Sequence, residues 1–305
     1  MGSDHRLMRT KIDSYEDDTF IMKSLSVGDQ PTIRCSVASF FDVLRTSHSL
    51  EWELLMAISK VKKRKSFSWQ DVSEFTKLRN RLHENVQDPV KNGDGRTSGL
   101  AISTLLAYRT NKGMEMMLRR RGKLSISLRR GQFQILPSGM FQAPLKVHDK
   151  EYSIFHSFLW EFFEELFCGG EIRKKYVHPE GIYGEPNVSH LLGMFEKNEA
   201  ELHFTGIAVD LLSLRPEVLL TLCIKDPKWY ANKFSNSKIH NQIKYNPEHA
   251  KASELPVGVS AALRIELGKN PETIFHEKKF TPENLTPPGA AALWQGINKL
   301  NTLFL

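Results

Sequence analysis

The sequence contains few cysteines and no long apolar run. Its three cysteines, Cys35, Cys168 and Cys223, are widely spaced and form no C-x-x-C pair, which argues for free thiols in a reducing compartment and against structural zinc. No stretch reaches the roughly 18 consecutive apolar residues that a membrane helix requires, and the first residues lack the apolar core of a secretory signal. We therefore expect a cytoplasmic chain without a membrane partner.

The composition is that of an ordinary globular protein with an excess of positive charge. At 305 residues, of which 40% are hydrophobic and 25% charged, the chain can bury one large core or two modest ones. The net charge of +7 favours a polyanionic partner, and nucleotides and nucleic acids satisfy that requirement equally. Composition leaves the oligomeric state open, including a homo-oligomer.

The sequence changes character at a segment rich in turn-forming residues, 87–98. Before it, residues 37–44 and 50–58 have apolar side chains at helical spacing, and 69–86 predicts a longer helix with Ser68 as its N-cap. We therefore predict a mostly helical accessory region over residues 1–97, followed by a second domain over residues 98–305.

The second region alternates strand and helix patterns. Apolar and β-branched residues predict a hairpin from strands 100–108 and 113–118, and further strands over 132–136, 202–212, 218–224 and 260–267. Helices are expected over 187–197 and 290–300, the latter after Pro288 in its first turn. This order predicts an α+β fold in which a mixed β-sheet lies between helices.

Between the strand 132–136 and residue 170 lies the most informative pattern of the chain. A turn built on Pro137, Ser138 and Gly139 precedes a helix whose acids, Glu161, Glu164 and Glu165, share one arc at spacing i, i+3 and i+4. Three carboxylates on one face repel one another unless a cation neutralises them, and Mg²⁺ prefers oxygen ligands shared with substrate phosphates. The alternative is an acidic stripe that is simply the solvated face of an amphipathic helix.

A glycine turn, a spacer and Glu-x-x-Glu-Glu on a helix resemble the signature of the Nudix hydrolase superfamily. Gly139 matches the opening glycine of that signature, and residues 161–165 match the core of its helix. Trp160 stands where the family has arginine, Leu145 where it has its first glutamate, and Phe167 where it has a late glycine; the spacer is seven residues longer. In the family the missing arginine and glutamate brace the loop, whereas the helix glutamates hold the metal.

The resemblance implies a Nudix-like domain over residues 98–305 that hydrolyses a nucleoside diphosphate derivative with Mg²⁺, or with Mn²⁺ in its place. Carried over by position, the three glutamates would be the catalytic metal ligands, completed by a main-chain carbonyl of Ser138 or Gly139. In this chain the strand 114–118 ends in a run of arginines, and the equivalent strand of the family lies near the substrate cleft. One of three arginines would therefore contact a phosphate: Arg119, Arg120 or Arg121.

Two other functions stay open. The altered brace positions are compatible with a catalytically degenerate domain that binds a nucleotide-like ligand and signals through the N-terminal helices. The basic run KVKKRK at 60–65, with the helix 69–86, could instead bind nucleic acid, although a solvated helix end explains the run equally. Glu248, Glu254 and Glu266 are candidates for a general base, and the aromatics of 226–230 could stack on a nucleotide base.

Overall fold

A computed structural model describes residues 18–62, 66, 68–121, 131–168, 176–232, 262–266, 274–276 and 280–304. The chain forms two compact units: unit 1 comprises Met1–Ala101, Met140–His148 and Val209–Pro216, and unit 2 comprises Ile102–Gly139, Asp149–Ala208 and Glu217–Leu305. Their first division lies close to the boundary at 97/98 expected from the sequence, but two later segments return to unit 1. Among the described residues, none of the helices has the length and apolar character needed to cross a membrane.

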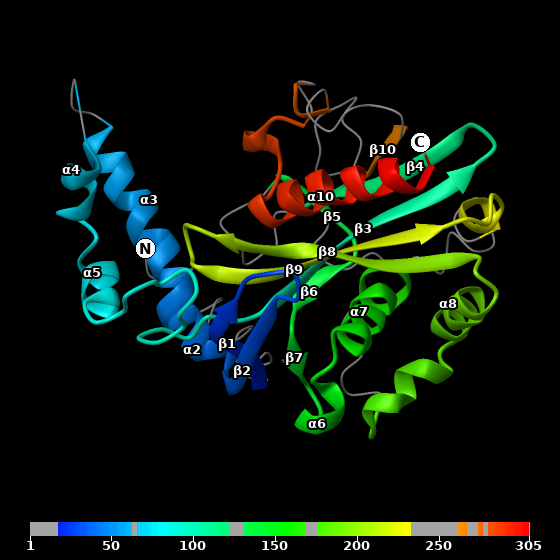
Figure 1. The fold of residues 1–305 in the computed structure, drawn as a ribbon, viewed down its shortest axis with the longest axis horizontal. Coiled ribbons are helices and arrows are strands. Elements are labelled where there is room, and N and C mark those ends of the chain that lie inside the picture. The colour runs from blue at the N-terminus through cyan, green and yellow to red at the C-terminus, as the bar shows by residue number, and fades with distance from the viewer. Residues whose placement is uncertain are drawn as a thin grey trace, which may run out of the picture. The chain divides into compact units, whose positions relative to one another are not determined.

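Unit 1 combines a small antiparallel sheet with short helices (Figure 1). In the sheet, β1 (Asp18–Ser26) pairs with both β2 (Thr32–Ser39) and β7 (Gln142–Ala143). The helical segments are α2 (Phe40–Val43), η1 (Leu44–His48), α3 (Ser49–Val61), α4 (Trp69–Ser73) and α5 (Lys77–His83). The strands β1 and β2 were not predicted, and residues 37–39 extend β2, so the helix expected over 37–44 begins only at Phe40.

The long helix expected over 69–86 is divided into α4 and α5. Ser68 is the N-cap, as predicted: its hydroxyl accepts a hydrogen bond from the Asp71 N–H at 3.3 Å, and the Asp71 carboxylate accepts one from the Ser68 N–H at 2.7 Å. A second helix start follows because Glu53 of α3 accepts hydrogen bonds from the N–H groups of Leu78 and Arg79 at 2.6 and 2.9 Å. A carboxylate from another helix therefore satisfies donors at the N-terminus of α5.

A seven-stranded sheet, lying mainly in unit 2, has the order β10-β4-β3-β9-β8, with β5 paired to β4 and β6 paired to β3. The predicted hairpin is present, because β3 and β4 pair antiparallel around Thr110 and Gly113. The strands are β3 (Ala101–Thr110), β4 (Gly113–Arg120), β5 (Phe133–Ile135), β6 (Ser138–Met140), β8 (Ala200–Asp210), β9 (Arg215–Ile224) and β10 (Ala262–Glu266).

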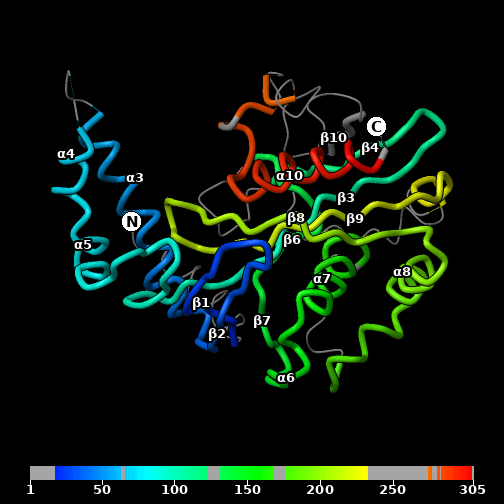
Figure 2. The backbone as a smooth tube through the Cα atoms, in the orientation of Figure 1, coloured from blue at the N-terminus to red at the C-terminus, as the bar shows by residue number. Residues whose placement is uncertain are grey.

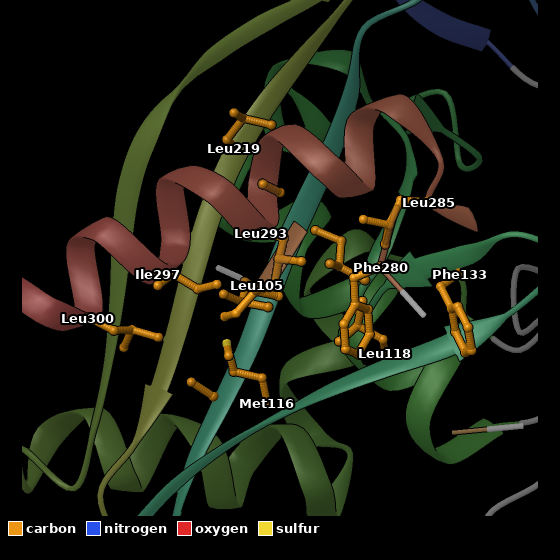
Figure 3. Packing of buried hydrophobic residues seen from close by; sticks show 14 of the residues in the cluster. Leu105, Met116, Leu118, Phe133, Leu219, Phe280, Leu285, Leu293, Ile297 and Leu300 are labelled. Atoms are coloured by element: carbon orange, nitrogen blue, oxygen red, sulfur yellow. The ribbon is translucent and has the colours of Figure 1, made fainter. Parts of the chain in front are cut away.

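Helices lie on both faces of this sheet (Figure 1): α10 (Pro287–Phe304) on one face, α7 (Ile154–Phe163) and α8 (Pro186–Glu196) on the other. Leu293, Ile297 and Leu300 of α10 recur at helical spacing and pack on sheet residues such as Leu105 and Met116 (Figure 3). All five side chains are fully buried. The α+β fold with a sheet between helices is therefore confirmed.

Candidate active site

The glycine turn and the acidic helix both belong to unit 2. The chain leaves β5, passes through a cis Leu136–Pro137 peptide bond and enters β6 at Ser138. Further on, α7 begins after Ser153, whose hydroxyl accepts the His156 N–H at 3.2 Å, and it continues into a π-helical turn, η2 (Glu164–Cys168). Figure 2 traces this path from β6 through β7 and α6 (His148–Glu151) into α7.

Two of the three helix glutamates contact the turn. The Ser138 N–H donates a hydrogen bond of 2.8 Å to Oε2 of Glu165, and both residues are buried. The Glu161 carboxyl fills the space beside Gly139, because a Cβ added to that glycine would lie 2.1 Å from Glu161 Oε1. The sequence pattern thus corresponds to a real contact between turn and helix, and glycine at 139 leaves room for the carboxyl.

A chain of hydrogen bonds extends this contact to the arginine run. Arg121 donates from Nη1 to Oε1 of Gln134, and Gln134 donates from Nε2 to the hydroxyl of Ser138. Ser138 in turn binds Glu165 through its main chain. We did not predict a role for Gln134. Its signal was a single polar residue between two buried neighbours of β5, Phe133 and Ile135.

The three arginines do not share one face of the sheet. Arg120 lies over the ring of Phe133, with its guanidinium carbon 4.4 Å from the ring centroid, and donates to the Gly131 carbonyl at 2.9 Å. Phe133 belongs to the core beneath α10, so the side chain of Arg120 lies on the face of the sheet that α10 covers. Because side chains alternate along a strand, Arg119 and Arg121 point to the opposite face. The hydrogen bond from Arg121 to Gln134 links this arginine to the turn.

The described residues contain no group of three or more acidic, histidine or cysteine side chains that could hold a metal ion. The three-carboxylate ligand set expected from the sequence stays a prediction. Two features of the helix bear on it: η2 begins at Glu164, where a π-turn changes the angular spacing of side chains, and Glu165 accepts a hydrogen bond from the Ser138 N–H.

The residues at the turn nevertheless suit Mg²⁺ in their chemistry. Mg²⁺ takes only one or two carboxylates from protein and fills its octahedron with water and substrate phosphates. Glu161 and Glu165 supply two carboxylates at one turn. A carboxylate has two oxygens with several acceptor positions, so the hydrogen bond from Ser138 does not use up the ligand capacity of Glu165.

Trp160, which stands where the resemblance calls for arginine, is buried among aromatic side chains. Its ring meets that of Tyr176 edge to face with centroids 5.6 Å apart, and the ring of His156 lies 6.0 Å away. Nδ1 of His156 is 3.1 Å from the Tyr183 hydroxyl. Burial lowers the pKa of His156, and the negative charge of Glu180 opposes this in part. Packing against aromatic rings therefore surrounds Trp160. Leu145, the other brace position, lies in unit 1.

The remaining sequence candidates have other positions. Trp229 is 2% exposed and Tyr230 stacks on Tyr108 at 4.7 Å, so the aromatics of 226–230 anchor the end of β9 in the core. Residues 63–65 of the basic run, Glu248 and Glu254 lie outside the described residues, as does the side chain of Glu266.

No protein-family model and no curated protein sequence matches the chain. Among solved structures, the chain is similar to a C. elegans Ap4A hydrolase crystallised as a binary complex, with 10% sequence identity over 67% of this chain and 98% of that chain and a TM-score of 0.30. A likeness at this level carries no functional argument. The hydrolase hypothesis therefore depends on the residues of the turn and the helix.

Proposed function

We propose that unit 2 hydrolyses a phosphoric anhydride bond in a nucleoside diphosphate derivative, at the turn of Ser138 and Gly139 facing the acidic helix. The observation that carries this proposal is the double contact of helix and turn, Glu165 with the Ser138 N–H and Glu161 with Gly139. Such an arrangement places two carboxylates beside main-chain groups, where Mg²⁺ can be shared with a pyrophosphate.

Each residue has a distinct part in this proposal. Glu161 and Glu165 would hold the metal ion, with Glu164 beside them and a carbonyl of Ser138 or Gly139 as a further ligand. The bound ion would neutralise the phosphate charge that otherwise repels an incoming water. Arg121 would neutralise a further phosphate oxygen, since a guanidinium binds oxygen pairs in a planar fork. Arg121 donates a hydrogen bond to Gln134, and Gln134 donates one to the Ser138 hydroxyl, so the guanidinium is linked to the turn through one side chain.

The test is turnover of a panel of nucleoside diphosphate derivatives with Mg²⁺, or with Mn²⁺, by the wild type and by a Glu164→Gln, Glu165→Gln double variant. The matched control is Glu196→Gln, which removes an exposed acid from the end of α8. We expect the double variant to lose at least about 100-fold in rate and the control to keep the wild-type rate. Equal rates in all three proteins would exclude this site.

A second candidate, a degenerate domain that binds a nucleotide without turnover, is favoured by two observations. The described residues lack a three-ligand metal group, and Trp160 packs among aromatics where the resemblance calls for an ionic brace. This function predicts thermal stabilisation by a nucleotide in the absence of turnover. That stabilisation would persist in the double glutamine variant.

A further inference from the structure

Arg96 in unit 1 is a buried cation held by main-chain oxygens. Its side chain is 5% exposed. Nη1 donates to the Asn92 carbonyl at 2.8 Å, and Nη2 donates to the carbonyls of Pro89 and Leu214 at 2.6 and 3.2 Å. Carbonyl dipoles offset part of a buried charge but carry no net negative charge themselves. Among the described residues, the charged group that acts on Arg96 is another cation, Arg79.

Arg79 of α5 lies in the same neighbourhood. Its Nη2 donates to the carbonyl of Leu212, in the turn between β8 and β9. Two carboxylates act on Arg79, Glu53 and Asp210. Both carboxylates also accept hydrogen bonds from the main chain. Glu53 accepts from the N–H groups of Leu78 and Arg79, and Asp210 accepts from the Leu212 N–H at 3.1 Å.

The two guanidinium groups and His83 leave three buried nitrogen atoms without a hydrogen-bond partner in the described part of the chain: Nε of Arg79, Nε2 of His83 and Nε of Arg96. The Nε atoms of Arg79 and Arg96 are donors, whereas Nε2 of His83 donates or accepts according to its tautomer. A buried donor without an acceptor costs about 1–3 kcal/mol, so two such donors in one neighbourhood indicate a missing acceptor. Burial, followed by the charges of Arg96 and Arg79, lowers the pKa of His83 to about 4. Burial and the charge of Arg79 lower the pKa of Arg96 to about 10.

We propose that Arg79, His83 and Arg96 form a binding site for a phosphate group. A phosphate carries up to two negative charges and offers three acceptor oxygens, which suits the uncompensated charge of Arg96 and the unpaired Nε donors of Arg79 and Arg96. Guanidinium groups are the preferred partners of such oxygens. Arg79 and His83 are only partly buried, whereas Arg96 is buried. This site is separate from the function proposed for unit 2 and does not depend on it.

The site predicts a change in the protonation of His83. In the free protein burial and the charges of the two arginines lower the pKa of His83, and a bound dianion adds a negative charge beside the ring. An opposite charge within hydrogen-bond range raises a histidine pKa by about 1 or more. We therefore expect the NMR titration of the His83 ring to move to higher pH in inorganic phosphate, with saturation, compared with chloride at the same ionic strength.

Substitutions identify the residues involved. Arg79→Gln is expected to weaken phosphate binding at least about tenfold, measured by calorimetry on the full chain. The control is Arg81→Gln on the exposed side of the same helix, which removes the same charge and should leave the affinity unchanged. If Arg79→Gln does not fold, His83→Gln replaces it and should also weaken binding, because it removes one of the three nitrogens.

Several results would overturn the proposal. A His83 pKa that is the same in phosphate and in chloride would show that the cluster binds no phosphate. So would equal affinities for the wild type, Arg79→Gln and Arg81→Gln, since binding would then lie elsewhere. Equal binding of acetate and phosphate would reject phosphate as the ligand class. Calorimetry under the same conditions compares the affinity for inorganic phosphate with that for a phosphate ester such as a nucleoside monophosphate, and the tighter ligand identifies the source of the phosphate group.

Discussion

Charged side chains make hydrogen bonds to the main chain in both units, but the side chains are acidic in unit 2 and basic in unit 1. At the turn of unit 2, carboxylates meet N–H groups and a glycine, as Glu165 and Glu161 do at Ser138 and Gly139. In unit 1, the guanidinium of Arg96 donates to three carbonyls. The acids come from successive turns of one helical segment, whereas Arg96 takes one of its carbonyl partners from Leu214, more than a hundred residues later. The comparison shows why a motif can reveal one kind of site and miss the other.

The largest effect on stability is expected at the basic cluster. Arg96→Met keeps much of the apolar volume but leaves the buried carbonyl of Leu214 and the partly buried carbonyls of Pro89 and Asn92 without this donor. We expect the free energy of unfolding to fall by about 3 kcal/mol or more, measured by urea denaturation. Arg45→Met is the control, because Arg45 is 77% exposed in an ion pair with Asp42 and should cost no more than about 0.5 kcal/mol. Similar losses for both arginines would remove the distinction between them.

The turn of unit 2 should be sensitive in function more than in stability. Gly139→Ala places a Cβ against the flexible end of Glu161, so the carboxyl swings away and the fold survives. We expect hydrolysis to fall about 100-fold while the free energy of unfolding changes by less than about 1 kcal/mol. Gly193→Ala in α8, where a Cβ meets nothing, should keep the rate and stabilise the helix by about 0.5–1 kcal/mol. If Gly139→Ala hydrolyses the substrate at the wild-type rate, Glu161 takes no part in the reaction.

A smaller effect distinguishes the charge of Glu165 from its hydrogen bond. Glu165→Ala leaves the buried Ser138 N–H without an acceptor, and we expect a loss of about 1–3 kcal/mol in the free energy of unfolding. Glu165→Gln keeps an acceptor oxygen and should retain most of that stability, although it removes the charge that a metal would require. Urea denaturation of the two variants measures the difference. Equal losses would mean that the charge, rather than the hydrogen bond, stabilises the turn.

The smallest effect is a pH dependence that belongs to unit 1. The pKa of His83 falls from 6.5 to about 4 in the folded protein, through burial and the two arginine charges. Between these pH values His83 is protonated in the unfolded chain and neutral in the folded chain. The contribution of His83 to the free energy of unfolding is therefore complete above about pH 6.5 and falls as the pH drops toward 4. Because His83 is partly exposed, we expect a loss of about 1–2 kcal/mol.

Urea denaturation at several pH values between these limits measures this dependence. His83→Gln is the control, since it has no group that titrates in this range and should show a flatter profile. A wild-type profile as flat as that of the variant would show that His83 titrates normally in the folded state.

Much of the fold could be predicted from local patterns. The hairpin of β3 and β4, the strands β8, β9 and β10, and the helices α8 and α10 were expected close to their observed bounds, because alternation and helical spacing are local properties. The strands β1 and β2 were missed. β1 pairs with the adjacent strand β2 and also with β7, more than a hundred residues later, and only the second pairing lies beyond the reach of a local pattern.

The contacts of individual side chains were harder to predict than the secondary structure. Periodicity places Glu161, Glu164 and Glu165 on one helix arc, but the π-turn at Glu164 and the hydrogen bond to Ser138 decide where the carboxylates point. Likewise the run of three arginines reads as a uniform basic patch. Strand alternation and the packing of Arg120 on Phe133 divide it between two faces.

The sequence alone determined the α+β character, the order of the elements in unit 2, and the pairing of a glycine turn with an acidic helix, because each follows from short-range pattern. Tertiary structure alone decided that residues 140–148 and 209–216 join unit 1. It also decided that Arg79 and Arg96 meet the carbonyls of Leu212 and Leu214. The physical reason is that buried charges take their partners wherever the folded chain offers carbonyl groups, and that choice depends on long-range packing rather than on neighbours in sequence.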